Sequence, residues 1–146
     1  MTDTVIEKVL TDAFLTLNEF SGVPFIKRDA TGKLLNVSLP NIKFDPPTNA
    51  QYFILNFLPG EPEPAGLGEN AFNTWAGIFQ IDVFTPLGTG QAEQTEKMKW
   101  LYKLYGRGKV FDQVTIRRTY RAFQGAELTS FRTTIRVEWR ASLPKD

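Results

Sequence analysis

The 146-residue chain contains no histidine and no cysteine. Without histidine there is no imidazole to act as a general base, a metal ligand or a switch near neutral pH. Without cysteine there are no disulfides and no thiolate nucleophiles. Together these absences exclude Ser-His-Asp and Cys-His catalytic systems and the usual zinc sites. Carboxylate, lysine or tyrosine chemistry and Mg²⁺ or Ca²⁺ sites built from oxygen ligands stay open. Because the sequence shows no motif for them, we expect no catalytic residues, no metal and no cofactor.

A long apolar segment and a strong net charge are missing as well. No apolar run approaches the roughly 18 residues that are needed to span a bilayer. The first ten residues, MTDTVIEKVL, do not have the pattern of a signal peptide. The net charge of +1 gives no general attraction to nucleic acid or to a membrane surface. These features favour synthesis in the cytoplasm and no membrane contact.

The residues that are present can build one domain over 1–146, because 42% of them are hydrophobic and 12 are phenylalanine. Apolar residues at helical spacing predict a helix from Val5 to Leu17, which begins with a capping box and stops before Gly22. A second helix is predicted over residues 91–105, where acidic residues precede basic ones and two glycines follow.

The remaining pattern is that of strands. Residues 52–58 are apolar on both faces, which predicts a central strand that is covered on both sides. Residues 75–83 alternate before the segment TPLGTG, which we interpret as a turn and not as a phosphate loop. Residues 110–123 and 128–142 are joined by a short connection, which predicts a hairpin. The predicted fold class is α+β: an N-terminal helix and one central helix packed on a mainly antiparallel β-sheet, with a C-terminal β-hairpin.

Positive charge is concentrated in this hairpin. From Arg107 onwards the chain has nine Lys and Arg residues against four Asp and Glu residues. This segment has three interpretations: a solvated strand face, a nucleic-acid contact, or a surface that meets the acidic part of a neighbouring copy. The candidate residues on its two strands are Arg117, Arg121, Arg132, Arg136 and Arg140.

The clearest loop runs over residues 59–73 and is rich in proline, glycine and glutamate. A loop of this length in a compact domain is usually functional or disordered. We expect it to be mobile in the isolated chain and to become ordered in an interface. The candidate interface residues are Glu61, Glu63 and Glu69 of this loop, together with Trp100 on the outer side of the second helix.

Three consecutive features resemble a known family. They are the run PNIKFDPP, an aromatic strand that ends in Leu-Pro, and the segment GIFQIDVFTPLGTG, and together with the following helix they cover residues 39–106. This order resembles the tail terminator, or tail completion, proteins of long-tailed bacteriophages. The resemblance implies a non-enzymatic subunit of a hexameric ring at the end of the tail tube. The ring stops polymerisation of the tube and provides the attachment surface for the head connector.

The resemblance also implies partners and a location. The partners are further copies of the chain, the tail tube protein and the head-tail connector protein. The location is the tail end or neck of the virion, after synthesis in the host cytoplasm. In a ring, the basic hairpin faces either a neighbouring subunit or a lumen, where it contacts passing DNA non-specifically. Two alternatives stay open: a ligand-binding or enzymatic α+β domain with a pocket under loop 59–73, near Tyr52 and Trp75, and another connector or tube subunit.

Overall fold

The computed structural model describes residues 3–40, 42–64, 66, 68, 72–127 and 129–144. The elements, in chain order, are α1 (Asp3–Leu15), α2 (Leu17–Ser21), β1 (Val37–Ser38), β2 (Tyr52–Pro59), β3 (Glu63–Pro64), β4 (Phe72–Pro86), α3 (Ala92–Leu104), β5 (Val110–Phe111), β6 (Val114–Ala126) and β7 (Ser130–Pro144). The strands form one sheet in the order β1-β2-β4-β7-β6-β5, and β3 pairs with β4 beside this path. All pairs are antiparallel except β1 with β2.

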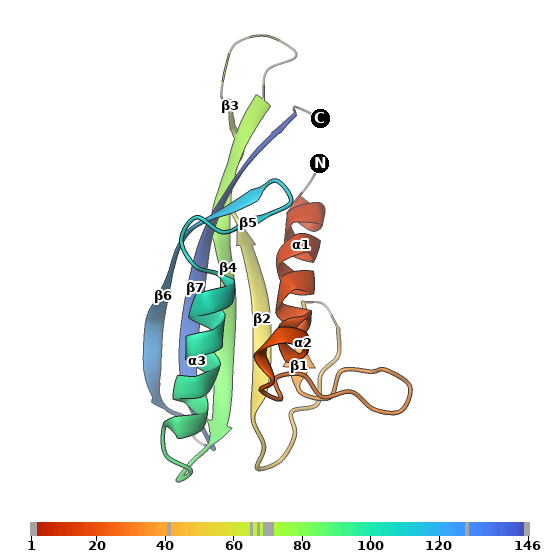
Figure 1. The fold of residues 1–146 in the computed structure, drawn as a ribbon, viewed down its shortest axis with the longest axis vertical. Coiled ribbons are helices and arrows are strands. Elements are labelled where there is room, and N and C mark those ends of the chain that lie inside the picture. The colour runs from red at the N-terminus through yellow and green to blue at the C-terminus, as the bar shows by residue number, and fades with distance from the viewer. Residues whose placement is uncertain are drawn as a thin grey trace.

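The predicted α+β class is wrong. Strands account for 44% of the structure and helices for 22%, and the sheet curls into a half-barrel instead of forming a flat layer under helices (Figure 1). The physical reason lies in the strand lengths, because β4 and β7 have 15 residues each and long strands twist and coil. In β6, register shifts at Ile116/Arg118 and at Arg121/Phe123 add two irregularities of the kind that bend a strand.

The helices correspond closely to the predicted segments but differ in detail. The first helix is interrupted at Thr16, whose amide and hydroxyl both donate to the Ala13 carbonyl, so α1 and α2 are separate. Gly22, with φ of 68°, ends α2. Helix α3 begins after the TPLGTG turn, where Gly88 and Gly90 have φ of 83° and 79°. The interpretation of this segment as a chain reversal is therefore confirmed.

The hydrophobic core lies on the side of the sheet that faces α1 and α3. Phe14 of α1 packs edge-on against Phe53 of β2, with ring centroids 5.3 Å apart. The Tyr105 hydroxyl, just after α3, donates to the Leu10 carbonyl of α1 at 2.7 Å. Burial raises the pKa of Tyr105 well above its usual value, so this hydroxyl stays a donor. Figure 1 shows α3 in front of β4 and β7, and α1 alongside β2.

The strand predictions had mixed outcomes. The C-terminal hairpin is confirmed, because β6 and β7 pair in antiparallel register. The prediction that β2 is covered on both faces is wrong, because Leu58 is 49% exposed and only one face contributes to the core. The segments VPFIKR and KLLNVSL, joined across the turn DATG, also predict two short strands. Among the described residues of 23–50, the structure shows instead the bridge from Arg28 to Leu34 and the two-residue β1.

Candidate functional site

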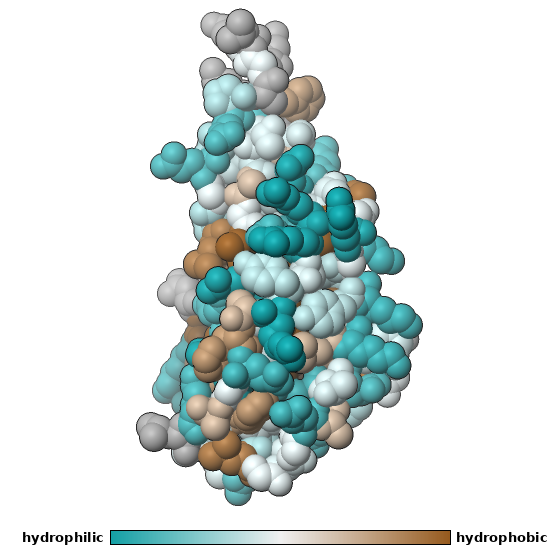
Figure 2. All heavy atoms as spheres, turned by 90° about the vertical axis from the view of Figure 1, so that its left-hand side faces the viewer, coloured by the Kyte–Doolittle hydropathy of each residue, from teal (hydrophilic) through white to brown (hydrophobic). Residues whose placement is uncertain are grey.

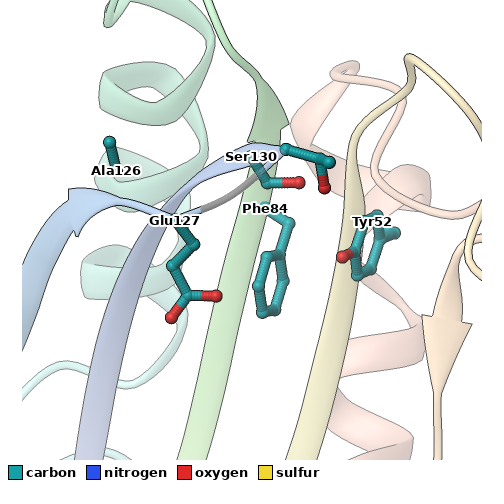
Figure 3. Close-up of a pocket in the computed structure, with 6 residues that line it drawn as sticks. Tyr52, Phe84, Ala126, Glu127 and Ser130 are labelled. Carbon is teal, nitrogen blue, oxygen red and sulfur yellow. The ribbon is translucent and has the colours of Figure 1, made fainter.

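One face of the sheet is left uncovered by the helices, and we call it the outer face. Strand register and the alternation of side chains define its members. They are Tyr52, Ile54, Asn56 and Leu58 of β2, Ile78, Gln80, Asp82 and Phe84 of β4, Arg118, Tyr120 and Phe123 of β6, and Arg132, Thr134, Arg136, Glu138 and Arg140 of β7. Figure 3 shows two of them, Tyr52 and Phe84, on the near side of their strands with helices behind the sheet.

Three of the four arginines of the outer face have partners on the same subunit. Arg118 makes two hydrogen bonds to the Glu138 carboxylate, at 2.8 and 2.9 Å. These bonds hold the pKa of Glu138 below its usual value. The Arg118 guanidinium also lies 4.7 Å from the centre of the Tyr120 ring. This cluster is therefore a preformed arrangement of charge and aromatic surface.

Two further arginines have different partners on the same subunit. Arg136 donates from Nε to Gln80 Oε1 at 3.2 Å. Arg132 forms an ion pair with Glu127, with 3.0 Å between Nε and Oε1, and its guanidinium lies 4.6 Å from the centre of the Phe123 ring. Figure 2 looks at the molecule from the side of β6 and shows hydrophilic side chains gathered over the middle of this side.

A polar pair lies buried within the outer face. Asp82 and Thr134 are 5% and 4% exposed, and the Thr134 hydroxyl donates to the Asp82 carboxylate. Thr134 lies on the face that strand alternation predicts, opposite to that of Ile135, but it is buried there and not exposed to solvent. Asp82 and Thr134 lie opposite each other on β4 and β7. Ile54 of β2 lies opposite Asp82, and Phe123 of β6 lies opposite Thr134. These two large side chains flank the polar pair and shield it from solvent.

The structure brings together most of the arginines that the sequence singled out. Arg132, Arg136 and Arg140 follow one another along the outer face of β7. Arg117 lies at the first irregularity of β6 and lines a hollow together with Glu138 and Arg140. Arg121 is separate, because its register partner Ile135 belongs to the buried, helix-facing side, and it donates instead to Gln124 at 2.9 Å.

The predicted acidic residues and Trp100 lie elsewhere. Glu61 and Glu63 are exposed at the β3 end of the sheet. Glu69 lies outside the described residues. Trp100 is half-buried on α3, where it packs against the core cluster and donates to Glu96 at 3.3 Å. The structure does not join these residues to the arginines in one site.

Sequence reasoning named Tyr52 but missed Arg118, Tyr120 and Phe123 of the outer face. A signal for them was present, because every cationic residue on β2, β4, β6 and β7 is arginine and none is lysine. Arginine pairs with carboxylates in a planar fork and stacks on aromatic rings, and lysine does neither as well. An arginine-only sheet therefore indicates a surface with fixed geometry.

The outer face ends in an open hollow of about 700 Å³. It is lined by Tyr52, Phe84, Ala126, Glu127, Thr129 and Ser130 (Figure 3). The rings of Tyr52 and Phe84 stack, with centroids 4.5 Å apart and planes 5° apart. Trp75 does not share this hollow, because β2 runs from Tyr52, opposite Phe84, to Pro59, opposite Gly77. Tyr52 and Trp75 therefore mark opposite ends of the sheet.

The described residues offer no cluster of three or more metal-ligating side chains. Within the same part of the chain, every helix is too short or too polar to cross a membrane.

Comparison with known proteins adds a family and a fold. A family model described as "Phage tail terminator protein" matches residues 22–139. A solved structure of a protein that carries no functional name is similar over 95% of this chain and 97% of that chain, with a TM-score of 0.62 and 15% sequence identity. At that identity the likeness shows the fold alone. The search of curated proteins found no match.

Proposed function

Because the chain belongs to the phage tail terminator family, a family of structural proteins of the virion tail, we propose that it is a non-enzymatic ring subunit. In this proposal, copies of the chain form a ring, hexameric as in the family, on the end of the tail tube. The ring stops tube polymerisation and presents a surface to the head connector. The partners are the tube protein, the connector protein and further copies of the chain.

The observation that carries the proposal is the uncovered outer face. Tyrosine, phenylalanine and arginine are enriched in protein–protein interfaces, whereas lysine is depleted. The outer face combines Tyr120, Phe123 and Tyr52 with four arginines and has no lysine. A sheet that is covered by helices on one side only leaves such a surface available to another protein. We assign it to contact between neighbouring subunits.

The alternative role for the arginines is to line a lumen through which DNA passes. In a lumen, the positive side chains must be available to DNA phosphates, and they need no fixed geometry. Arg118, Arg132 and Arg136 are instead each engaged by Glu138, Glu127 and Gln80 on the same subunit. Pre-arranged side chains of this kind fit a protein interface better, because less side-chain entropy is lost when the partner binds.

Particles assembled without this chain test the function as a whole. We expect tails of uncontrolled length, or tails that are not joined to heads, because nothing then ends tube polymerisation. Electron microscopy of particles from a phage that lacks the gene measures both outcomes. Complementation by the intact gene is the control. Normal, DNA-filled and joined particles in the deletion would overturn the proposal.

The double variant Arg132→Gln/Arg136→Gln tests the subunit interface. We expect the concentration needed for assembly to rise about tenfold or more, because charged contacts near an interface centre contribute more than those at its rim. Analytical ultracentrifugation measures assembly, and thermal unfolding checks that the subunit stays folded. Arg28→Gln, an exposed residue outside the sheet, is the matched control. Normal assembly with defective DNA retention would favour the lumen instead.

A further inference from the structure

A second hollow lies away from the outer face, at the end of the molecule where β4 stops and α3 begins. Its volume is about 510 Å³. Its lining includes Lys27, Gln51, Pro86, Thr89, Glu93 and Lys97. We call it the lysine cavity. It combines two lysines from distant parts of the sequence with the first two turns of α3.

Lys97 is an unusual residue for this position, because it is only 5% exposed. Its ammonium lies 4.8 Å from the centre of the Phe25 ring. No hydrogen bond or ion pair joins it to any described residue. Burial lowers the pKa of Lys97, and Glu93 and Glu96 offset that effect only in part. A buried cation without an acceptor is costly, so an incoming anion would relieve a penalty that already exists.

The opposite end of the molecule carries unpaired carboxylates. Residues 60–64, which we call the acidic arm, include the exposed Glu61 and Glu63. Neither carboxylate pairs with a cation among the described residues. The arm is held in place by its backbone, since Glu63 pairs with Thr74 of β4 and the Gly60 amide donates to the Ala76 carbonyl at 2.9 Å. The backbone of the arm is therefore placed beside β4, and its two carboxylates are open to solvent.

The arm and the cavity of one subunit are too far apart to meet. The arm pairs with β4 near Thr74, and the cavity includes Pro86 at the end of that strand. At a rise of about 3.3 Å per residue, this stretch of β4 spans roughly 40 Å. Figure 1 shows β3 and the end of β4 at opposite ends of the molecule. A contact between arm and cavity must therefore join two copies.

We propose that the acidic arm of one copy places a glutamate carboxylate, from Glu61 or Glu63, in the lysine cavity of the next copy. The carboxylate accepts hydrogen bonds from Lys27 and Lys97. Because the two surfaces differ, the contact is head-to-tail, and a head-to-tail contact closes into a ring when its rotation permits. The inference rests on the proposed ring and names the residues of a second contact within it.

Engineered disulfides test the contact directly, because the chain has no cysteine of its own. In the variant Lys27→Cys/Glu63→Cys, each copy carries one cysteine at each end. We expect oxidation of phage particles that carry it to give a ladder of covalent oligomers on non-reducing gels. The control Lys8→Cys/Glu63→Cys, with an exposed lysine on α1, should give no ladder. The variant Lys27→Cys/Glu61→Cys tests the other glutamate of the arm in the same way. Particles that contain either chain and give no ladder in both cases would overturn the inference and leave the ring itself intact.

Charge exchange provides a second test that does not depend on oxidation. Lys27→Glu alone and Glu61→Lys/Glu63→Lys alone should each raise the concentration needed for assembly by about tenfold. Combining all three changes should recover part of the lost assembly, since the arm lysines then meet the glutamate introduced at position 27, while Lys97 still opposes them. Both Lys27 and the glutamates are exposed, so the fold is not at risk. If the combined variant assembles no better than the two partial ones, the acidic arm does not bind the cavity.

Discussion

Trp139→Ala is expected to lower the free energy of unfolding by about 3–5 kcal/mol, the range for deletion of a large aromatic side chain from a core. Trp139 is 1% exposed and is among the largest fully buried side chains. Its ring stacks on Phe57, with centroids 5.5 Å apart and planes 8° apart. The β4 backbone also packs closely against the Trp139 ring, because a Cβ added at Gly77 would lie 2.7 Å from it. Denaturant unfolding measures the loss, and an m-value equal to that of the parent protein shows that the change is in stability alone.

Trp139→Phe is the matched control for this prediction. The indole nitrogen of Trp139 has no hydrogen-bond partner among the described residues, so phenylalanine loses no hydrogen bond and retains much of the stacking area. We expect a loss well below that of the alanine variant. Equal losses for the two variants would show that ring packing is not the source of the stability.

Gln94→Leu is expected to cost about 2–4 kcal/mol, because it leaves several buried polar groups without partners. Gln94 is fully buried on α3 and connects that helix to two strands. Its amide donates to the Phe131 carbonyl at 2.8 Å and to the Thr85 hydroxyl at 3.0 Å. Its carbonyl accepts from the Thr133 hydroxyl. Leucine has a similar volume, so the loss reports hydrogen bonding and not a cavity.

A double-mutant cycle with Thr133→Val isolates one part of this network. Each single variant breaks the bond between Gln94 and Thr133, so the double variant should cost less than the sum of the two. We expect a coupling of about 1 kcal/mol or more, since both groups are buried. Strict additivity of the two losses would contradict a direct interaction.

Residues whose position depends on local pattern were predictable. The alternation of Ile135, Val137 and Trp139 identified the buried side of β7, because successive side chains in a strand face opposite sides. The glycines of TPLGTG indicated a turn before α3, and both adopt positive φ. For the candidate site, the same alternation predicted that Arg132, Arg136 and Arg140 share one face.

Residues whose environment depends on other strands were not predictable. Arg121 has the spacing of an outer-face residue, but the register shifts of β6 place it opposite the buried Ile135. Asp82 and Thr134 have the pattern of solvent-facing residues, but they cover each other and their neighbours exclude water. The burial of Gln94 and Lys97 depends in the same way on how α3 meets the sheet.

The sequence by itself excluded catalysis and zinc binding by histidine and cysteine, because the chain contains neither residue. It also determined the main helices, the C-terminal hairpin and, through its motifs, the family. Only the tertiary structure decided the curl of the sheet, the pairing of Arg118 with Glu138, and the separation of the acidic arm from the lysine cavity. The physical reason is that hydrogen bonds along a strand or helix follow local spacing, whereas twist, bulges and register bring together residues that are distant in the chain.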